Sequence, residues 1–347
     1  MQASESDTLG YDVVQVTDWV GDHVPGLDPP FRWTRFHAGH SNLTCLLEDA
    51  GGRRAVIRRP PLGELQPRAH DMHREFRIIE ALWPTGVPVA EPLAYCGDPS
   101  VTGAHFFLMG FVAGRALPSS AEIEAHLPVE RRRTTSESHA DVLAALHVLD
   151  PDAAGLGDLG AREDYVGRQL RAWYRSWTTS AEAAGYDDPR VHELHAWLDA
   201  HKPPQGPARI AHGDYGLHNC LIGEDGRVAA VVDWEVCALG DPLADLAYVL
   251  NRWSGDGDVG PRGGITMPAG FLSRQAMADR YQAATGADLS GLGYYVAFNH
   301  WKSACIVHGV YTRYRRGQKS TDDVDLSGFR AMIGTSLASA QSSVESL

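Results

Sequence analysis

The most informative stretch of this 347-residue chain is AHGDYGLHNCLIGEDGRVAAVVDWEVCALGDPLADLA, residues 211–247. Within it, Asp214 lies five residues before Asn219, and Asp233 lies 14 residues after Asn219. Two apolar runs separated by a Gly-containing turn predict a short strand pair over residues 219–235. The stretch therefore gathers three polar side chains around one turn-strand-turn unit.

The three polar side chains are of the kinds that phosphoryl transfer requires. That reaction needs a carboxylate that positions an attacking hydroxyl and accepts its proton, and oxygen ligands that hold Mg²⁺ against nucleotide phosphates. Asp214 suits the first role, and Asn219 and Asp233 suit the second. A single Asp or Asn in a turn more often caps backbone groups, so the hypothesis depends on all three occurring in this order.

HGDxxxxN at 212–219, followed by DWE, resembles the aminoglycoside phosphotransferase and choline kinase superfamily, which is related to the protein kinases. RRPP at 58–61, DWEVCALGDPLADLAY at 233–248 and GYYVAFNHWKSACIVHGVY at 293–311 narrow the resemblance. In this order they are similar to phosphotransferase domains that in some eukaryotes are fused to acyl-CoA dehydrogenases. The similarity covers about residues 30–320.

This resemblance implies an α+β, protein-kinase-like bilobal fold. Residues 1–112 would form a small β-rich nucleotide-binding lobe, and 113–347 a larger helical lobe with the catalytic loop and the acceptor site. ATP and Mg²⁺ are the implied cofactors, and a small-molecule hydroxyl is the implied acceptor. Asp214 resembles the catalytic base of the family, and Asn219 with Asp233 resembles its metal-holding pair.

The hydrophobic pattern predicts the same division. Strands are expected around 43–48 and 54–59, followed by an amphipathic helix within 69–83. The later part of the chain has helical spacing, most clearly at 138–150 and 165–177. The chain is therefore expected to be β-rich first and mainly helical afterwards.

Three residues around the proposed site have structural interpretations. His212 is expected to brace the catalytic loop, as the ring at this position does in the family. Asp241 precedes Pro242, which is typical of a helix cap followed by Pro in the first helical position. Asp245 is expected to be structural in the same way.

AGHSNLT at 38–44 lies between two predicted strands, where similar proteins cover the ATP phosphates with backbone amides. Gly39 is the one glycine of this segment, so an ordinary hairpin turn is the alternative. Ser41 and Asn42 are able to donate hydrogen bonds or to adopt tight turns. We expect Gly39, Ser41 and Asn42 to contribute to a phosphate-binding loop.

Arg58 stands where kinases carry a strand lysine, and Glu75 is its expected helix partner. Arginine also binds phosphate oxygens, but through a planar fork whose geometry differs from that of lysine. A solvated Arg–Glu pair is the alternative. Strand alternation places Arg58 and Arg59 on opposite faces, so the sequence leaves open which of them meets phosphate.

The apolar run FFLMGFV at 106–112 is predicted to be a buried strand that leads into the connector between the lobes. Similar proteins bind adenine there through main-chain groups, and Met109 and Phe111 are the candidates. Apolar runs usually belong to a core, and main-chain recognition of adenine is compatible with that interpretation.

The segments expected around the acceptor, 165–177 and 293–317, contain no Asp or Glu. They do contain Arg168, Arg171, Arg175, Lys302 and Arg313. This local composition favours a neutral or anionic acceptor, of which the hydroxyacyl-CoA suggested by the similar domains is one. The net charge of the whole chain favours a cation instead, so an aminoglycoside or amino alcohol is the alternative.

The sequence also bears on two other classes of function, a polypeptide kinase and an inactive nucleotide-binding protein. A polypeptide substrate is disfavoured because only seven residues separate Asp233 from Asp241, which leaves no room for a kinase activation segment. An inactive nucleotide-binding or scaffold protein is the second alternative, since the proposed phosphate-binding loop has a single glycine and Arg58 replaces the usual lysine. The presence of Asp214, Asn219 and Asp233 argues against it.

Composition limits the partners. The chain has 31 Lys and Arg against 44 Asp and Glu, a net charge of −13, which argues against nucleic-acid binding. Five widely spaced cysteines form no CxxC pair, so neither a disulfide framework nor a zinc knuckle is expected. Without a long apolar stretch or a signal-like N-terminus, no membrane partner is expected and cytoplasmic residence is predicted. The sequence does not indicate an oligomeric state.

Overall fold

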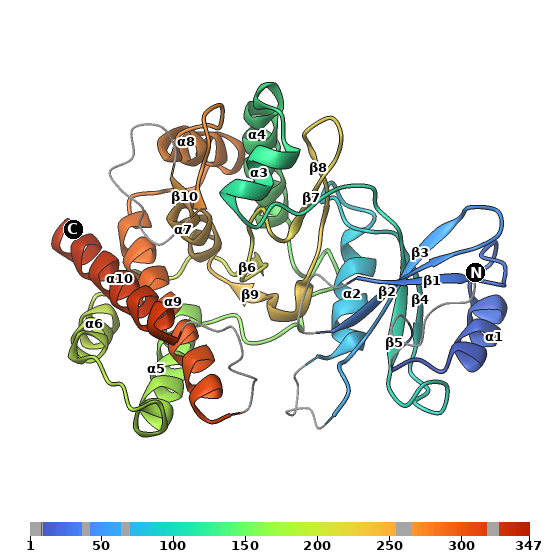
Figure 1. Cartoon of the computed structure of the whole chain (residues 1–347). Coiled ribbons are helices and arrows are strands. Elements are labelled where there is room, and N and C mark those ends of the chain that lie inside the picture. The colour runs from blue at the N-terminus through green and yellow to red at the C-terminus, as the bar shows by residue number, and fades with distance from the viewer. Residues whose placement is uncertain (1–7, 9, 37–41, 64–69, 255–264, 318–325) are drawn as a thin grey trace. The chain divides into compact units, whose positions relative to one another are not determined.

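The computed structural model describes residues 8, 10–36, 42–63, 70–254, 265–317 and 326–347 (Figure 1). The chain forms two compact units. The first unit comprises Met1–Arg115, Cys220–Gly223 and Val228–Val236, and the second comprises Ala116–Asn219, Glu224–Arg227 and Cys237–Leu347. The strand pair after the HGD motif thus belongs mainly to the first unit, although its turn belongs to the second.

The first unit is built on a five-stranded antiparallel sheet with strand order β1-β2-β3-β5-β4 (Figure 1). Its strands are β1 (Arg32–Arg35), β2 (Leu43–Glu48), β3 (Arg54–Arg59), β4 (Pro92–Cys96) and β5 (Phe106–Gly110). Burial alternates along β2, as expected for a strand that faces a core on one side. The strands predicted at 43–48 and 54–59 are confirmed.

Two helices of the first unit contact opposite faces of this sheet. Helix α1 (Val13–His23) places Val16 and Val20 in the same core cluster as Ile57 and Leu108. Helix α2 (Met72–Leu82), the predicted amphipathic helix, packs against β4 and β5. The Phe76 ring of α2 lies 5.8 Å from the ring of Phe107. The neighbours of Phe107 in the strand, Phe106 and Leu108, belong to the core cluster that includes α1, so Phe107 points to the other face of the sheet.

The strand pair β7 (Cys220–Ile222) and β8 (Val228–Val231) is antiparallel, as predicted, and is followed by the 3-10 turn η1 (Trp234–Val236). It is tied to the rest of the first unit by backbone hydrogen bonds. Val231 donates to the carbonyl of Pro88 at 2.8 Å, and Arg115 exchanges two bonds with Ile222. Asp233 therefore follows a strand that is anchored in the first unit.

The second unit is mainly helical. Its elements are α3 (Ser120–His126), α4 (Val129–Val148), α5 (Tyr165–Ala184), α6 (Pro189–Ala200), β6 (Arg209–Ala211), β9 (Ala238–Gly240), α7 (Pro242–Arg252), β10 (Trp253–Ser254), β11 (Ile265–Thr266), α8 (Arg274–Thr285), α9 (Leu292–Arg315) and α10 (Leu326–Glu345). Strands β6 and β9 are antiparallel partners, and β10 and β11 are parallel partners. The predicted order of a β-rich part and then a helical part is confirmed.

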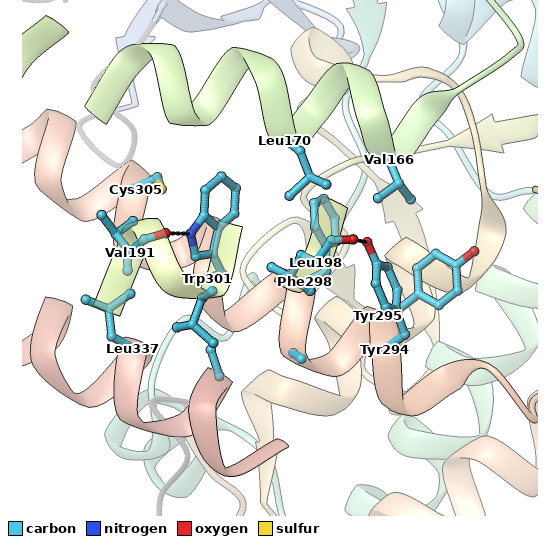
Figure 2. Close-up of a cluster of buried hydrophobic side chains, with 14 of the residues drawn as sticks. Val166, Leu170, Val191, Leu198, Tyr294, Tyr295, Phe298, Trp301, Cys305 and Leu337 are labelled. Atoms are coloured by element: carbon cyan, nitrogen blue, oxygen red, sulfur yellow. Dashed lines mark hydrogen bonds between the residues drawn. The ribbon is translucent and has the colours of Figure 1, made fainter. Parts of the chain in front are cut away.

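Helix α9 lies at the centre of the core of the second unit and packs against α5, α7 and α10. Figure 2 shows Phe298 and Trp301 of α9 among apolar side chains from the neighbouring helices. Two of the polar atoms in this core have backbone partners, since the Trp301 Nε1–H donates to the carbonyl of Val191 and the Tyr294 hydroxyl to that of Leu198. The burial of a satisfied indole and phenol fixes the orientation of α9 in the unit.

The predicted helix cap at Asp241 is confirmed. Its Oδ1 accepts from the backbone N–H of Leu243 at 3.0 Å, and Pro242 occupies the first helical position of α7. All five cysteines are buried, and none of them forms a disulfide. In the described part of the chain, no helix combines the length and apolar character that a membrane span requires.

Candidate active site

The loop after β6 holds Asp214 in the second unit. One carboxylate oxygen, Oδ1, accepts from the Tyr248 hydroxyl of α7 and lies 3.2 Å from Nε2 of His218. The other oxygen, Oδ2, accepts from the Asn219 side-chain amide at 3.1 Å. A side chain from α7 and two from the loop itself therefore fix the orientation of the Asp214 carboxylate.

These contacts keep Asp214 ionised. Burial alone would raise the pKa of Asp214, but the hydrogen bond from His218, the electrostatic interaction with His218 and the hydrogen bond from Tyr248 outweigh it. Together they lower the pKa of Asp214 to about 2. An ionised carboxylate accepts hydrogen bonds only, so Asp214 is suited to receive one from an approaching hydroxyl.

Asp245, in the first turn of α7, holds the backbone of the loop that carries Asp214. Its Oδ2 accepts from the backbone N–H of His212 at 2.6 Å, and its Oδ1 accepts from that of Gly213 at 3.0 Å. The His147 ring lies 3.4 Å from Oδ2 and contacts the Tyr281 hydroxyl through its other nitrogen at 2.8 Å. Asp245 is thus structural, as predicted, but it acts on the loop that carries Asp214 and not on its own helix end.

His212 is fully buried, and its Nδ1 accepts from the backbone N–H of Asp214 at 3.3 Å. This contact agrees with the interpretation of His212 as a brace of the loop. Asn219 uses its side-chain N–H₂ group on both the carbonyl and the Oδ2 of Asp214. With the N–H₂ group committed in this way, the Oδ1 of Asn219 is the atom that remains to bind a ligand.

In the first unit, Arg58 on β3 forms two ion pairs. Its Nε lies 3.2 Å from Oε2 of Glu75 on α2, and its Nη2 lies 2.6 Å from Oδ1 of Asp233. Only 14% of the Arg58 side chain is exposed, which excludes the alternative of a solvated surface pair. The predicted Arg58–Glu75 partnership is therefore present in the structure.

Arg59 lies on the other face of the sheet. Its guanidinium donates to the carbonyl of Thr102 at 2.7 Å and to that of Gly10, and it lies over the ring of Tyr11. These contacts commit Arg59 to holding the segment before α1. Of the two arginines, Arg58 is the one that lies beside Asp233 and Glu75.

Asp233 has a backbone φ of +67°, a conformation that non-glycine residues rarely adopt. It follows β8, and the next residue is fixed because the Trp234 indole donates to the carbonyl of Val231 at 3.1 Å. Its side chain remains 29% exposed, with Oδ1 accepting from Arg58. The strand and the turn therefore present this carboxylate to solvent at a defined position.

Asn42 lies between Arg58 and His70. The amide orientation that satisfies both neighbours points the oxygen toward Nη2 of Arg58, at 2.8 Å, and the nitrogen toward Nδ1 of His70. Asn42 is thus adjacent to the guanidinium proposed to bind phosphate. The other two residues predicted for this loop, Gly39 and Ser41, lie outside the described residues.

The predicted adenine-binding residues lie at the end of β5. Met109 is in the strand, opposite Val56 of β3 and Pro92 of β4. The backbone N–H of Phe111 donates to the carbonyl of Arg54 at 3.3 Å, and the Arg54 guanidinium covers the Phe111 ring. A ligand that needs a donor at Phe111 would have to displace that bond.

Sequence reasoning missed Tyr248 and His218 as partners of Asp214. Tyr248 had a usable signal, because Asp241, Asp245 and Tyr248 recur at a spacing of four and three residues, which places them on one face of a helix. His218 had none beyond its position within HGDYGLHN. Its ring lies so close to Gly216 that a Cβ there would be 2.7 Å from Nδ1, so any larger residue at 216 would displace the His218 ring.

The charged groups around Arg58, which are Glu75, Asp233 and Glu235, lead to a testable dependence of stability on pH. Burial, with the charges of Asp233 and Glu235, raises the pKa of Glu75 to about 7 despite the opposing effect of Arg58. A carboxyl whose pKa is higher in the folded state stabilises the protein at low pH, and this stabilisation is lost as the pH rises from about 4.5 through about 7. From pH 5 to pH 8, nucleotide-free wild type should therefore lose about 2–3 kcal/mol of unfolding free energy relative to Glu75→Gln.

Urea unfolding of wild type and Glu75→Gln at both pH values measures this difference. Glu182→Gln, a matched change of an α5 carboxyl, should show no such divergence from wild type. If Glu75→Gln and wild type keep a constant difference between pH 5 and pH 8, Glu75 titrates outside this range and the inferred burial effect is wrong.

Comparison with known proteins agrees with the motifs. A family model described as the phosphotransferase enzyme family matches residues 32–289. Acyl-CoA dehydrogenase family member 11 of Rattus norvegicus is 32% identical over 324 residues, which cover 90% of this chain. The alignment spans only 41% of that relative, so the similarity is to one part of a longer protein.

Solved structures show the same fold. A "putative aminoglycoside phosphotransferase" from Ralstonia eutropha JMP134 is 29% identical and superposes with a TM-score of 0.80 over 96% of this chain and 99% of its own. A spectinomycin phosphotransferase solved in complex with ADP and spectinomycin is 13% identical, with a TM-score of 0.61 over 94% and 98% of the two chains. The α+β, kinase-like fold expected from the motifs is confirmed.

Proposed function

The chain belongs to the phosphotransferase enzyme family, and from this premise we propose that it transfers the γ-phosphoryl group of ATP to a hydroxyl of a small molecule. The observation that carries the proposal is the Asp214 carboxylate, which is ionised and held by Tyr248, His218 and Asn219. Kinase-like small-molecule phosphotransferases are the proteins whose fold this chain shares.

Asp214 is proposed to act as the catalytic base. A carboxylate with a pKa of about 2 is too weak a base to ionise a free alcohol, so it first orients the hydroxyl through a hydrogen bond. The hydroxyl proton becomes acidic only as the oxygen bonds to phosphorus, and Asp214 accepts it at that stage. The hydrogen bonds from Tyr248 and His218 keep the carboxylate in one orientation throughout.

Asn219 and Asp233 are proposed to hold Mg²⁺. Both offer oxygen atoms, the donors that Mg²⁺ prefers, and in each an oxygen remains once the observed hydrogen bonds are made. When bound, Mg²⁺ would neutralise charge on the β- and γ-phosphate oxygens. The residues present therefore fit the ion that the family implies.

The nucleotide is proposed to be bound by residues of the first unit. Arg58, supported by Glu75 and adjacent to Asn42, supplies a fixed positive charge for phosphate, and Gly39 and Ser41 belong to the same proposed loop. Main-chain groups of Met109 and Phe111 are proposed to meet adenine, and use of the Phe111 N–H requires release of its bond to the carbonyl of Arg54. The ADP bound by the related spectinomycin phosphotransferase supports nucleotide use of this kind.

Nucleotide binding is the part of this proposal to test first. Wild type should be stabilised by ATP only when Mg²⁺ is present, by about 2.7 kcal/mol at a ligand concentration 100 times the Kd. Asp233→Ala should lose that stabilisation, because it removes a proposed Mg²⁺ ligand. Thermal unfolding of both proteins with ATP, with Mg²⁺ and with the two together measures the effect.

Asp225→Ala is the matched control, since Asp225 is an exposed carboxylate between β7 and β8 with 63% of its side chain accessible. It should respond to ATP and Mg²⁺ as wild type does. An identical Mg²⁺-dependent shift in Asp233→Ala would exclude Asp233 as a ligand. If wild type itself does not respond, ATP binding is refuted and the chain shares only the fold of its relatives.

A second candidate, an amino alcohol kinase, is favoured by one observation. A cavity of about 410 Å³ in the second unit is lined by four carboxylates, those of Asp150, Asp152, Glu163 and Asp164. Such a lining would suit a cationic acceptor. However, none of its lining residues belongs to the catalytic loop 212–219 or to α7, and Asp152 and Asp164 already pair with Arg162 and Arg171.

A further inference from the structure

Lys302 carries a buried amine without a close partner. It lies in the middle of α9 and retains only 9% of its accessible surface. It makes no hydrogen bond and no close ion pair with any residue that the structure describes. Buried polar groups are nearly always hydrogen-bonded, and an ammonium group loses more by dehydration than a neutral group does. The Lys302 nitrogen is not fully enclosed, so it is open to a ligand that supplies a hydrogen-bond partner.

The helical spacing places Lys302 on the face of α9 that meets α7. Tyr295 of this face donates to Oδ2 of Asp241 at 2.5 Å, and Asn299 donates to the carbonyl of Ala244 at 2.8 Å. Lys302 follows these two residues at the i+7 and i+3 positions, so it extends the same stripe. Its side chain is thus directed to the helix that carries Asp245 and Tyr248.

Burial lowers the pKa of Lys302, and the charges of Asp245 and Asp214 oppose this lowering. Both carboxylates are committed to other donors. Asp245 accepts from the backbone of His212 and Gly213, and Asp214 accepts from Tyr248, His218 and Asn219. Neither carboxylate forms a direct bond with the Lys302 amine, and an anionic ligand beside that amine would favour its protonated form.

We propose that Lys302 binds an anionic oxygen of the acceptor, which makes the acceptor a hydroxylated acid and not an amino alcohol. This inference rests on the proposed function and specifies its substrate class. An acceptor whose hydroxyl reaches Asp214 places its neighbouring substituents near Lys302. There an anionic oxygen gains a charge-assisted hydrogen bond, whereas an ammonium group meets a like charge in a partly dehydrated site.

The experiment uses four probes that share a three-carbon diol frame and differ in charge. Glycerate carries a carboxylate, glycerol 3-phosphate a phosphate, glycerol no charge, and 3-amino-1,2-propanediol an ammonium group. Binding of each to the nucleotide-free full chain is measured by thermal unfolding at constant ionic strength. The proteins are wild type, Lys302→Met, Lys302→Arg and Arg315→Met, the last being an exposed cation at the end of the same helix.

Wild type should bind glycerate or glycerol 3-phosphate about tenfold or more tightly than 3-amino-1,2-propanediol, and Arg315→Met should behave in the same way. Lys302→Met should remove this preference or reverse it in favour of the ammonium probe, because Asp214 then dominates the local charge. Lys302→Arg should retain the preference. Whether glycerate or glycerol 3-phosphate binds better identifies the anion as carboxylate or phosphate.

Two results would overturn the inference: a wild type without charge preference among the four probes, and a preference that persists unchanged in Lys302→Met. A structural role for Lys302 would lower stability equally with every probe and would leave the ratio of affinities unchanged. Because no nucleotide is present, the result does not depend on phosphoryl transfer. Anion selectivity without ATP turnover would refute the proposed function alone, and turnover of amino alcohols by wild type would refute this inference alone.

Discussion

Asp214→Asn should lower the rate of ADP formation by about 10²–10⁴-fold, the range that a positioned acid or base usually contributes. Asparagine keeps the size of the side chain, and its oxygen still accepts from Tyr248 and His218. Its N–H₂ group replaces Oδ2 and loses the bond from Asn219, but Asn219 still donates to the backbone carbonyl of residue 214, so the loop should keep its conformation. It cannot accept the hydroxyl proton. Nucleotide affinity should stay within about twofold of wild type, so that the loss appears in kcat and not in KM for ATP.

Steady-state ADP release with glycerate as acceptor, and with water as the fallback acceptor, measures this loss. Asp225→Asn is the control, because it makes the same chemical change at an exposed position in the same stretch of sequence. Turnover of Asp214→Asn within about threefold of wild type would show that Asp214 is not the base. Nucleotide binding without turnover of any acceptor in wild type would favour the inactive scaffold.

The sequence was sufficient for features that depend on local spacing. The strand pair that precedes Asp233 and the cap of α7 by Asp241 follow from turn, strand and capping preferences within a few residues. The contact between Asp214 and Asn219 lies within the turn of a single loop. Such short-range geometry is encoded by the residues that form it.

The choice between Arg58 and Arg59 required the register of the sheet. Alternation shows that the two side chains point to opposite faces but does not show which face α2 covers. The pairing of Arg58 with Phe107, and the packing of Phe107 on α2, place Arg58 beside Glu75. The pairing of β3 with β5 is a long-range contact, and one sequence alone does not determine it.

The anchoring of the loop by Asp245 could not be read from side-chain patterns. Its partners are backbone N–H groups of His212 and Gly213, more than 30 residues earlier, and every non-proline residue carries such a group. The burial of Lys302 could not be predicted from the sequence for a related reason. Helix α9 has buried residues around most of its circumference, so its periodicity does not distinguish a core-facing lysine from an exposed one.

Asp245→Asn should be the most destabilising single change among those considered, with a loss of about 3–5 kcal/mol, as is usual when one partner is removed from a buried charged network. The Asp245 carboxylate accepts from two backbone donors and contacts His147, and only 2% of its side chain is exposed. An asparagine offers one acceptor, and its N–H₂ group must then face a backbone N–H. Asp279→Asn, an exposed carboxylate on α8, should stay within about 0.5 kcal/mol of wild type.

The pH dependence of this loss separates the charge of Asp245 from its shape. Burial would raise the pKa of Asp245, but the hydrogen bond and charge of His147, with the hydrogen bond from the N–H of Gly213, lower it below its ordinary value of 3.8. A carboxyl with a lowered pKa stabilises the fold above its unfolded pKa, and that stabilisation is lost as the pH falls through the folded pKa. The difference in unfolding free energy between wild type and Asp245→Asn should therefore be full at pH 7 and shrink below about pH 4. Urea unfolding at pH 7, 5, 4 and 3 measures it, and a difference that does not change with pH would mean that the fit of the side chain, and not its charge, holds the catalytic loop.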